Sequence, residues 1–233
     1  MGSLVRTALE TPAPQPRIAV PHFKEILAIE SSAPSGSLAL WRDGRLVDVR
    51  EFQSERAHNS VLFAPLDAVL RQAEALELIV CGTGPGSYSG VRVGIAAAIG
   101  VSLARGVPLI GMPSVGALFQ ARGLDRYAVC GDARRGAWWW SVVENGGLVQ
   151  PPVAAPLEET AALAAAWHGP VFTVVAASPA FCQATPAIPR AEMLAEAAAG
   201  LSESAVARLA AQPVEPIYLS APFVTVSKQP VFA

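Results

Sequence analysis

The sequence predicts an α/β protein with a mixed sheet and a second half that repeats the opening of the first. Three apolar segments joined by short turns come first, and strands and helices then alternate. A strand that ends on an acid, a tight turn and another strand occur twice, with Glu30 and Asp132 as the two acids. The chain has 233 residues, of which 52% are hydrophobic, so it is long enough to bury a core.

The first half reads as an antiparallel meander followed by alternating helices and strands. Three short strands are expected at 26–30, 38–41 and 45–52. Leucines and valines at helical spacing then predict a helix over 54–75. The following elements are expected to be a buried strand (77–82), a helix (91–105) that ends at Gly106 and Pro108, another strand (107–111) and a helix from Pro113.

The second half predicts fewer and shorter elements. We expect strands at 127–132, 137–146, 171–175 and 216–219 and helices at 157–167, 191–199 and 203–211. If the repeated strand and acid reflect a duplication, two related lobes face each other. The predicted organisation is a disordered or extended, proline-rich tail (1–24), an N-terminal lobe (25–112) and a smaller C-terminal lobe (113–233).

Composition excludes several classes of protein. Seventeen Lys and Arg against 19 Asp and Glu give a net charge of −2, which disfavours a strongly basic nucleic-acid binder. Cys81, Cys130 and Cys182 are far apart, so they predict neither a disulfide framework nor a zinc site, and a reducing, cytoplasmic location fits. The uncharged run 93–104 is too short for a membrane span, which needs about 20 residues.

A glycine-rich loop at 82–90 follows a strand and opens a helix, a position that suits anions. It matches neither the dinucleotide-binding GxGxxG pattern nor a P-loop, because Ser87 or Ser89 stands at the sixth position and no Lys is present. Two interpretations remain open. The loop binds phosphate directly, or it is a compact turn that lets a helix pack closely on the sheet.

The helix at 91–105 has charges only at its ends, Arg92 and Arg105. A helix that is apolar on all sides is expected to be buried on all sides. One face can pack on the sheet, and the opposite face, with Gly94, Ala97 and Val101 as candidates, needs another cover. Large exposed apolar patches are rare on monomers, so a partner protein is favoured over cover from the same chain.

Catalytic groups are scarce. His22, His58 and His168 have no metal-ligand spacing such as HxxxH. Glu30 and Asp132 are candidates to hold a metal or nucleotide between lobes, or they accept hydrogen bonds within their turns. The run 138–140 of three tryptophans favours packing over base stacking, since successive strand residues point to opposite faces.

Four segments together resemble one family. They are ILAIESSAPSGSLAL, GPGSYSGVRVGIAAAIGVSLARGVPLIGMPSVGAL, CGDARRGAWWW and PIYL. They are similar to the TsaB (YeaZ) family of bacterial tRNA threonylcarbamoyladenosine biosynthesis proteins, and the second segment, of the GPGSFTGxRxG type, is the most specific. The resemblance extends from Ile26 to Leu219. It implies an actin-like ATPase fold, related to ribonuclease H, of two duplicated lobes with mixed sheets.

The resemblance also implies a scaffold without catalysis of its own. Family members pair with a paralogous catalytic subunit, TsaD, which carries HxxxH and transfers the threonylcarbamoyl group to the adenosine beside the anticodon of tRNA. A TsaE ATPase joins the complex. This implies that the chain itself requires no cofactor, that ATP or ADP could bind at the partner interface, and that tRNA is contacted indirectly. An unpaired chain could form a homodimer.

The resemblance assigns roles to two sets of residues. Partner-binding residues are expected on the helices matching 58–73 and 91–105: His58, Val61, Leu62, Pro65, Arg92, Gly94, Ala97, Ala98 and Val101. Residues expected near a nucleotide are Glu30, Ser31, Ser32, Gly84, Gly86, Ser87 and Asp132. The alternative function is a nucleotide-dependent enzyme of the actin-like fold, an ATPase or transferase, that acts by itself.

Overall fold

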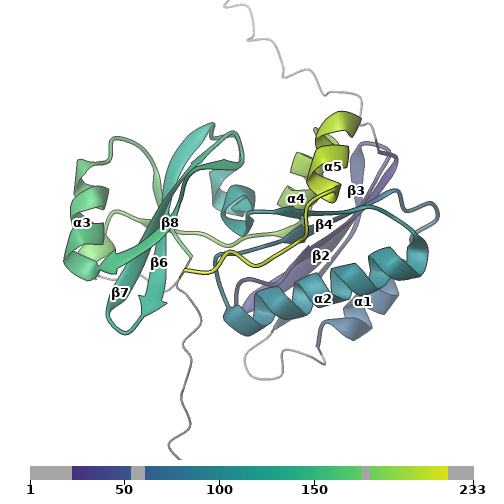
Figure 1. The fold of residues 1–233 in the computed structure, drawn as a ribbon, viewed down its shortest axis with the longest axis horizontal. Coiled ribbons are helices and arrows are strands. Elements are labelled where there is room, and N and C mark those ends of the chain that lie inside the picture. Colours follow the sequence, from purple (N-terminus) through teal and green to yellow (C-terminus); the bar gives the residue numbers. More distant parts are fainter. Residues whose placement is uncertain (1–22, 54–60, 175–178, 220–233) are drawn as a thin grey trace, which may run out of the picture.

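The computed structural model describes residues 23–53, 61–174 and 179–219, which form two sheets with helices around them (Figure 1). The first sheet has the order β3-β2-β1-β4-β5. β1 and β2, and β2 and β3, pair antiparallel, whereas β1, β4 and β5 run parallel. The strands are Glu25–Glu30 (β1), Ser35–Arg42 (β2), Arg45–Gln53 (β3), Leu78–Gly82 (β4) and Leu109–Met112 (β5).

The second sheet repeats this topology strand for strand. Its order is β10-β9-β6-β7-β8, so β6 occupies the place of β1, with antiparallel neighbours on one side and parallel neighbours on the other. The strands are Arg126–Arg134 (β6), Ala137–Glu144 (β7), Gly147–Pro156 (β8), Val171–Thr173 (β9) and Thr185–Pro186 (β10). The duplication predicted from the repeated strand and acid is therefore confirmed.

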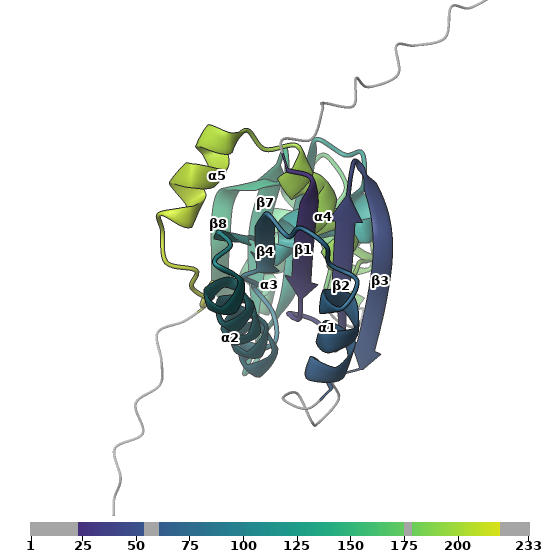
Figure 2. The ribbon, with the colours of Figure 1, turned by 90° about the vertical axis from the view of Figure 1, so that its right-hand side faces the viewer.

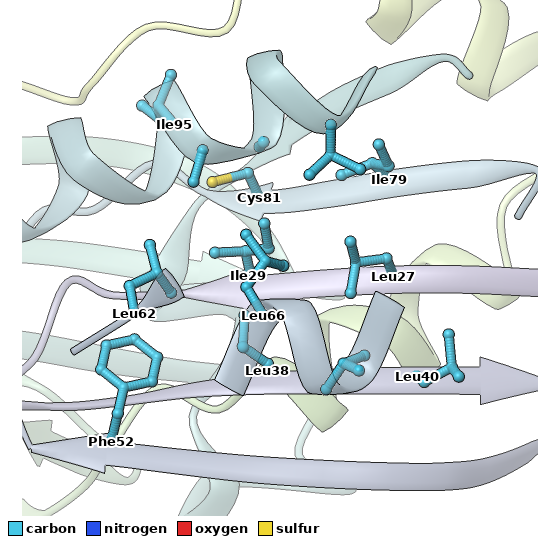
Figure 3. Packing of buried hydrophobic residues seen from close by; sticks show 14 of the residues in the cluster. Leu27, Ile29, Leu38, Leu40, Phe52, Leu62, Leu66, Ile79, Cys81 and Ile95 are labelled. Carbon is cyan, nitrogen blue, oxygen red and sulfur yellow. The ribbon is translucent and has the colours of Figure 1, made fainter. Parts of the chain in front are cut away.

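Helices cover both faces of the first sheet. On one face, α1 (Phe63–Leu70) and α2 (Tyr88–Arg105) pack on the alternate residues Leu27, Ile29 and Cys81, as Figure 3 shows. On the other face, α4 (Ala191–Ala199) and α5 (Glu203–Ala210) pack on Ile26, Ala28 and their neighbours. The two central strands β1 and β4 are buried on both sides, which explains the uninterrupted apolar runs at 26–29 in β1 and through the whole of β4.

The second sheet is covered less fully. α3 (Leu157–Ala166) packs on the face that carries Trp140, whereas Trp139 points into the opposite core. Both tryptophans are buried, so the prediction that this run serves packing is confirmed. Short 3₁₀ turns at Ser114–Ala117 and Phe119–Ala121 stand where a helix from Pro113 was predicted. A further 3₁₀ turn spans Pro179–Phe181.

The predicted boundary at 112/113 needs one correction, because residues after 113 do not all join the second lobe. α4 contacts β1 and β2, and its first N–H group, at Ala191, donates to Ser37 Oγ at 2.9 Å. The sequence analysis also missed β8, which contains three prolines and lies at the sheet edge, where missing N–H groups are tolerated. The expected strand at 216–219 makes no ladder within the described residues. Its Ile217 N–H donates to Thr83 O at 2.8 Å.

The starts of α1 and α2 differ from the predicted starts, whereas α2 ends at Arg105 as predicted. α1 begins only at Phe63, and the predicted start at 54–60 lies outside the described residues. α2 begins three residues earlier than expected because the Ser87 side chain caps it, accepting from the Gly90 N–H at 3.2 Å. Among the described residues, no helix is both long and apolar enough to cross a membrane.

Candidate functional site

The side of α2 that was predicted to bind a partner packs inside the protein. Gly94, Ala97, Ala98 and Val101 are all buried against the sheet and α1. Leu62 is wholly buried as well, and Val61 and Pro65 are half-buried. His58 lies outside the described residues. Gly94, Ala97 and Val101 therefore belong to the core, and the choice of this face as the interface was wrong.

The opposite side of α2 is exposed and largely apolar. Starting from Tyr88, the helical period places Arg92, Ala96, Ile99 and Leu103 on one stripe, and all five are exposed. Leu103 is 80% exposed, and Phe63 on the neighbouring α1 is 53% exposed. We call these six residues the helical face. The sequence predicted that the face of α2 away from the sheet needs cover from outside the chain, and no helix or strand of the described residues covers this face.

Packing beneath the helical face holds the two helices in place. Leu66 and Val69 of α1 and Ile95 and Val101 of α2 share one core cluster with the first sheet. Figure 2 shows α1 and α2 side by side on the same face of that sheet. The exposed residues above this core therefore sit on a rigid support, which is the arrangement that an interface requires.

The glycine-rich loop is closed rather than open to a ligand. A Cβ on Gly86 would overlap Ser32 O, and one on Gly90 would overlap Ser31 O. The Ser87 N–H donates to Ser32 O at 2.7 Å, and the Ser31 hydroxyl donates to Gly90 O at 2.9 Å. The glycines thus let α2 approach the turn after β1. Of the two interpretations left open by the sequence, the geometry favours close packing over direct phosphate binding.

Glu30 lies beneath this loop and is fully buried. Its Oε1 accepts from the Ser32 N–H at 2.6 Å, whereas its Oε2 has no hydrogen-bond partner among the described atoms. A Cβ on Gly82 would overlap this carboxyl group, so the glycine provides the space for it. Burial raises the pKa of Glu30 above its usual range, and the Ser32 hydrogen bonds oppose this effect less strongly.

The predicted nucleotide residues come together only in part. Ser32 meets Gly86 and Ser87 directly, whereas Ser31 meets Gly90 and Glu30 meets Gly82. The Gly84 N–H donates to Ser114 Oγ at 2.9 Å. Asp132 belongs to the other lobe, where its Oδ1 accepts from the Arg134 N–H at 2.6 Å. That contact is the turn hydrogen bond proposed as the simpler role of this acid.

Other side chains that could react with a substrate or bind a metal are also buried or lie apart from one another. Burial raises the pKa of the Cys81 thiol, which disfavours the reactive thiolate. Within residues 23–53, 61–174 and 179–219, no group of three or more His, Cys, Asp or Glu side chains is placed to hold a metal ion.

Sequence reasoning named Arg92 but missed its exposed neighbours. Tyr88, Ala96, Ile99 and Leu103 repeat at helical spacing from Arg92, the one charge in the first half of α2. Because a charged side chain marks the solvent side of a helix, that spacing was the available signal. Phe63 carried no comparable signal, because which side of α1 faces the sheet depends on tertiary packing.

Comparisons with known proteins identify relatives that match between about half and two thirds of this chain in sequence. Residues 52–155 match the family model of TsaD, tRNA N6-adenosine threonylcarbamoyltransferase. The chain is 31% identical over 132 residues to the tRNA threonylcarbamoyladenosine biosynthesis protein TsaB of Escherichia coli, a match that covers 52% of this chain and 57% of that protein. It is 31% identical over 166 residues to the uncharacterized protein Rv3421c of Mycobacterium tuberculosis, covering 66% of this chain and 78% of that protein.

Solved structures agree with this relationship. YeaZ from Pseudomonas aeruginosa is 27% identical, with a TM-score of 0.65, and the match covers 84% of this chain and all of that one. A second structure from the same organism, described as similar to peptidase YeaZ, gives 26% identity and a TM-score of 0.66 with the same coverage. The duplicated lobes have the architecture that the family resemblance implied. The chain therefore belongs to the TsaB/YeaZ family.

Proposed function

We propose that this protein is a non-catalytic scaffold subunit in tRNA threonylcarbamoyladenosine biosynthesis, and that it pairs with a TsaD-like catalytic subunit through the helical face. The observation that carries the proposal is the exposed apolar stripe on α2, in which Leu103 is the most exposed of the large apolar side chains. Such a patch on a rigid support is typical of a protein interface.

The family match supports a TsaD-like partner in particular. The part of this chain that resembles the TsaD family, residues 52–155, contains α1 and α2. A TsaD-like protein therefore has a segment similar to the one that carries the helical face. Two similar helix pairs can pack around an approximate twofold axis, as in isologous contacts between identical subunits. The same reasoning supports homodimer formation when the partner is absent.

A scaffold role also fits the chemistry of the loops. Glu30 is buried and the glycine-rich loop is filled by Ser31 and Ser32, so neither offers a group positioned to act on a substrate. In the proposed complex, the TsaD-like subunit transfers the threonylcarbamoyl group to the adenosine next to the anticodon, and a TsaE-like ATPase takes part. In that complex this chain contacts tRNA indirectly, and ATP or ADP binds at the partner interface.

The first test is size-exclusion chromatography with light scattering. The chain is measured alone, then with the TsaD-like protein of the same organism, with and without ATP. We expect a new species at the summed mass. Two unshifted peaks under both conditions would contradict the proposal, and ATP turnover by the isolated chain would then favour the enzyme alternative.

The second test uses a matched pair of leucines. Leu103→Glu places a charge on the helical face, and Leu163→Glu does so on α3 of the second lobe, where Leu163 is 45% exposed. Burying an unpaired charge typically costs about 3–5 kcal/mol, so Leu103→Glu should weaken partner binding at least about 100-fold. Leu163→Glu should bind normally. Equal effects of the two substitutions would place the interface elsewhere.

A further inference from the structure

The chain after α5 runs along α2 on the side away from α1, and we call residues 213–219 the C-terminal strap (Figure 2). Val214 packs against the core cluster of α2 and close to Gly111. The Ile217 N–H donates to Thr83 O at 2.8 Å, which ties the strap to the start of the glycine-rich loop. Leu219 then packs against the core of the second lobe. The strap is thus held at three points along its length.

The strap contributes an aromatic side chain to one end of the helical face. The ring of Tyr218 lies 5.9 Å from that of Tyr88, centroid to centroid. Arg92 donates to the Tyr88 hydroxyl at 2.7 Å, and its guanidinium lies 5.0 Å from the centre of the same ring. Tyr88 is 61% exposed and Tyr218 is 50% exposed. Two tyrosines and an arginine therefore form one accessible cluster, and these residue types dominate binding energy at interfaces.

A groove lies between the strap and the other end of α2. It has a volume of about 610 Å³, and its lining includes Ile99 and Ser102 of α2, Leu109 of β5, and Val214 and Glu215 of the strap. Ile99 belongs both to the groove and to the helical face, so the two surfaces are continuous. The exposed carboxylate of Glu215 lies at this end, whereas the charge of Arg92 lies at the other.

We infer that the C-terminal strap forms the second half of the docking surface for the TsaD-like partner. The partner places an acidic side chain at the Tyr88–Arg92–Tyr218 cluster and an apolar side chain in the groove, with a basic side chain toward Glu215. Arg92 and Ser102 are ten residues apart on α2, a rise of about 15 Å, so a single helix of the partner spans both. This inference rests on the proposed function.

The test measures the affinity for the TsaD-like partner by calorimetry, with the full-length chain and four variants. Tyr218→Ala should weaken binding by about 10-fold or more. Tyr218→Phe should bind like the unaltered chain, because the ring rather than the hydroxyl makes the contact. Arg92→Glu should weaken binding by a similar factor and more strongly at low salt, since it repels the partner's acidic side chain. Val153→Ala, which truncates an exposed side chain of β8, should bind like the unaltered chain.

The outcomes separate this inference from the proposed function. If the unaltered chain does not bind the partner, both are overturned. If it binds, Leu103→Glu abolishes binding, and Tyr218→Ala and Arg92→Glu both bind normally, then only the strap inference is wrong. Thermal unfolding of each variant checks the fold, and Arg92→Glu is the second probe if Tyr218→Ala proves unstable. If the two substitutions weaken self-association alone, the strap serves a second copy of this chain, which also overturns the inference.

Discussion

Glu30 is an ionisable group that the fold holds away from water. It ends β1 and is fully buried, and one of its oxygens has no hydrogen-bond partner among the described atoms. Removal from water disfavours the carboxylate, so the pKa of Glu30 is raised above its usual range. The folded protein therefore keeps this proton at pH values where the unfolded chain has released it. The contribution of the Glu30 carboxyl group to the free energy of unfolding is therefore largest at acidic pH and falls as the pH rises toward the folded-state pKa.

The substitution Glu30→Gln tests this reasoning. A glutamine keeps the acceptor for the Ser32 N–H and cannot ionise. Each pH unit over which only the unfolded carboxyl ionises costs the native protein about 1.4 kcal/mol. The free energy of unfolding of the variant should therefore rise relative to the unaltered chain between pH 4.5 and pH 8, measured by urea denaturation. Glu159→Gln, at an exposed site, is the control. Parallel pH profiles for the Glu30→Gln variant and the unaltered chain would contradict the raised pKa.

At the scale of an element, α2 combines two different faces. Its buried side has small residues because the turn after β1 approaches closely, and a Cβ on Gly94 would overlap Ser31 Oγ. Its exposed side carries Gly100, where an added Cβ meets no atom within 4 Å. Two glycines six residues apart on one helix therefore have opposite structural consequences, although the sequence gives both the same helix propensity.

Replacing each glycine by alanine should change stability in opposite directions. Gly94→Ala should lower the free energy of unfolding by about 1–3 kcal/mol, because the overlap forces α2 or Ser31 to move. Gly100→Ala should raise it by up to about 1 kcal/mol, since alanine favours the helix and no clash opposes it. Denaturation curves of both variants measure the difference. If Gly94→Ala were neutral, the close contact between α2 and the β1–β2 turn would be wrong.

At the scale of the whole molecule, two lobes of the same topology serve different purposes. The first lobe is covered on both faces and displays the helical face on α1 and α2, with the C-terminal strap beside it. The second lobe receives Leu219 from the strap and has its own smaller core. When no other partner is available, an exposed apolar face of this size favours association with the same face of a second copy.

The isolated chain should therefore self-associate in a concentration-dependent way. Light scattering over a dilution series should show mass above the monomer value of 24.2 kDa at high concentration. Leu103→Glu should remain at the monomer mass, because the buried charge is repelled from the apolar contact. Adding the TsaD-like protein should replace the self-associated species. A monomer at all concentrations would mean that the helical face is not sufficient for self-association.

The sequence determined the class of fold, the duplication and the position of most strands and helices, because apolar periodicity and turn residues act locally. It also indicated that α2 needs a partner, since its lack of charge is visible without a structure. Only the tertiary structure decided which side of α2 is buried against the sheet and which side is exposed. A helix with apolar residues on every side carries no directional signal, and the close approach of Ser31 selects Gly94 for the inside and leaves Leu103 outside. The return of α4 to the first lobe and the path of the strap along α2 also arise from contacts between residues far apart in the chain, such as Ala191 with Ser37 and Ile217 with Thr83.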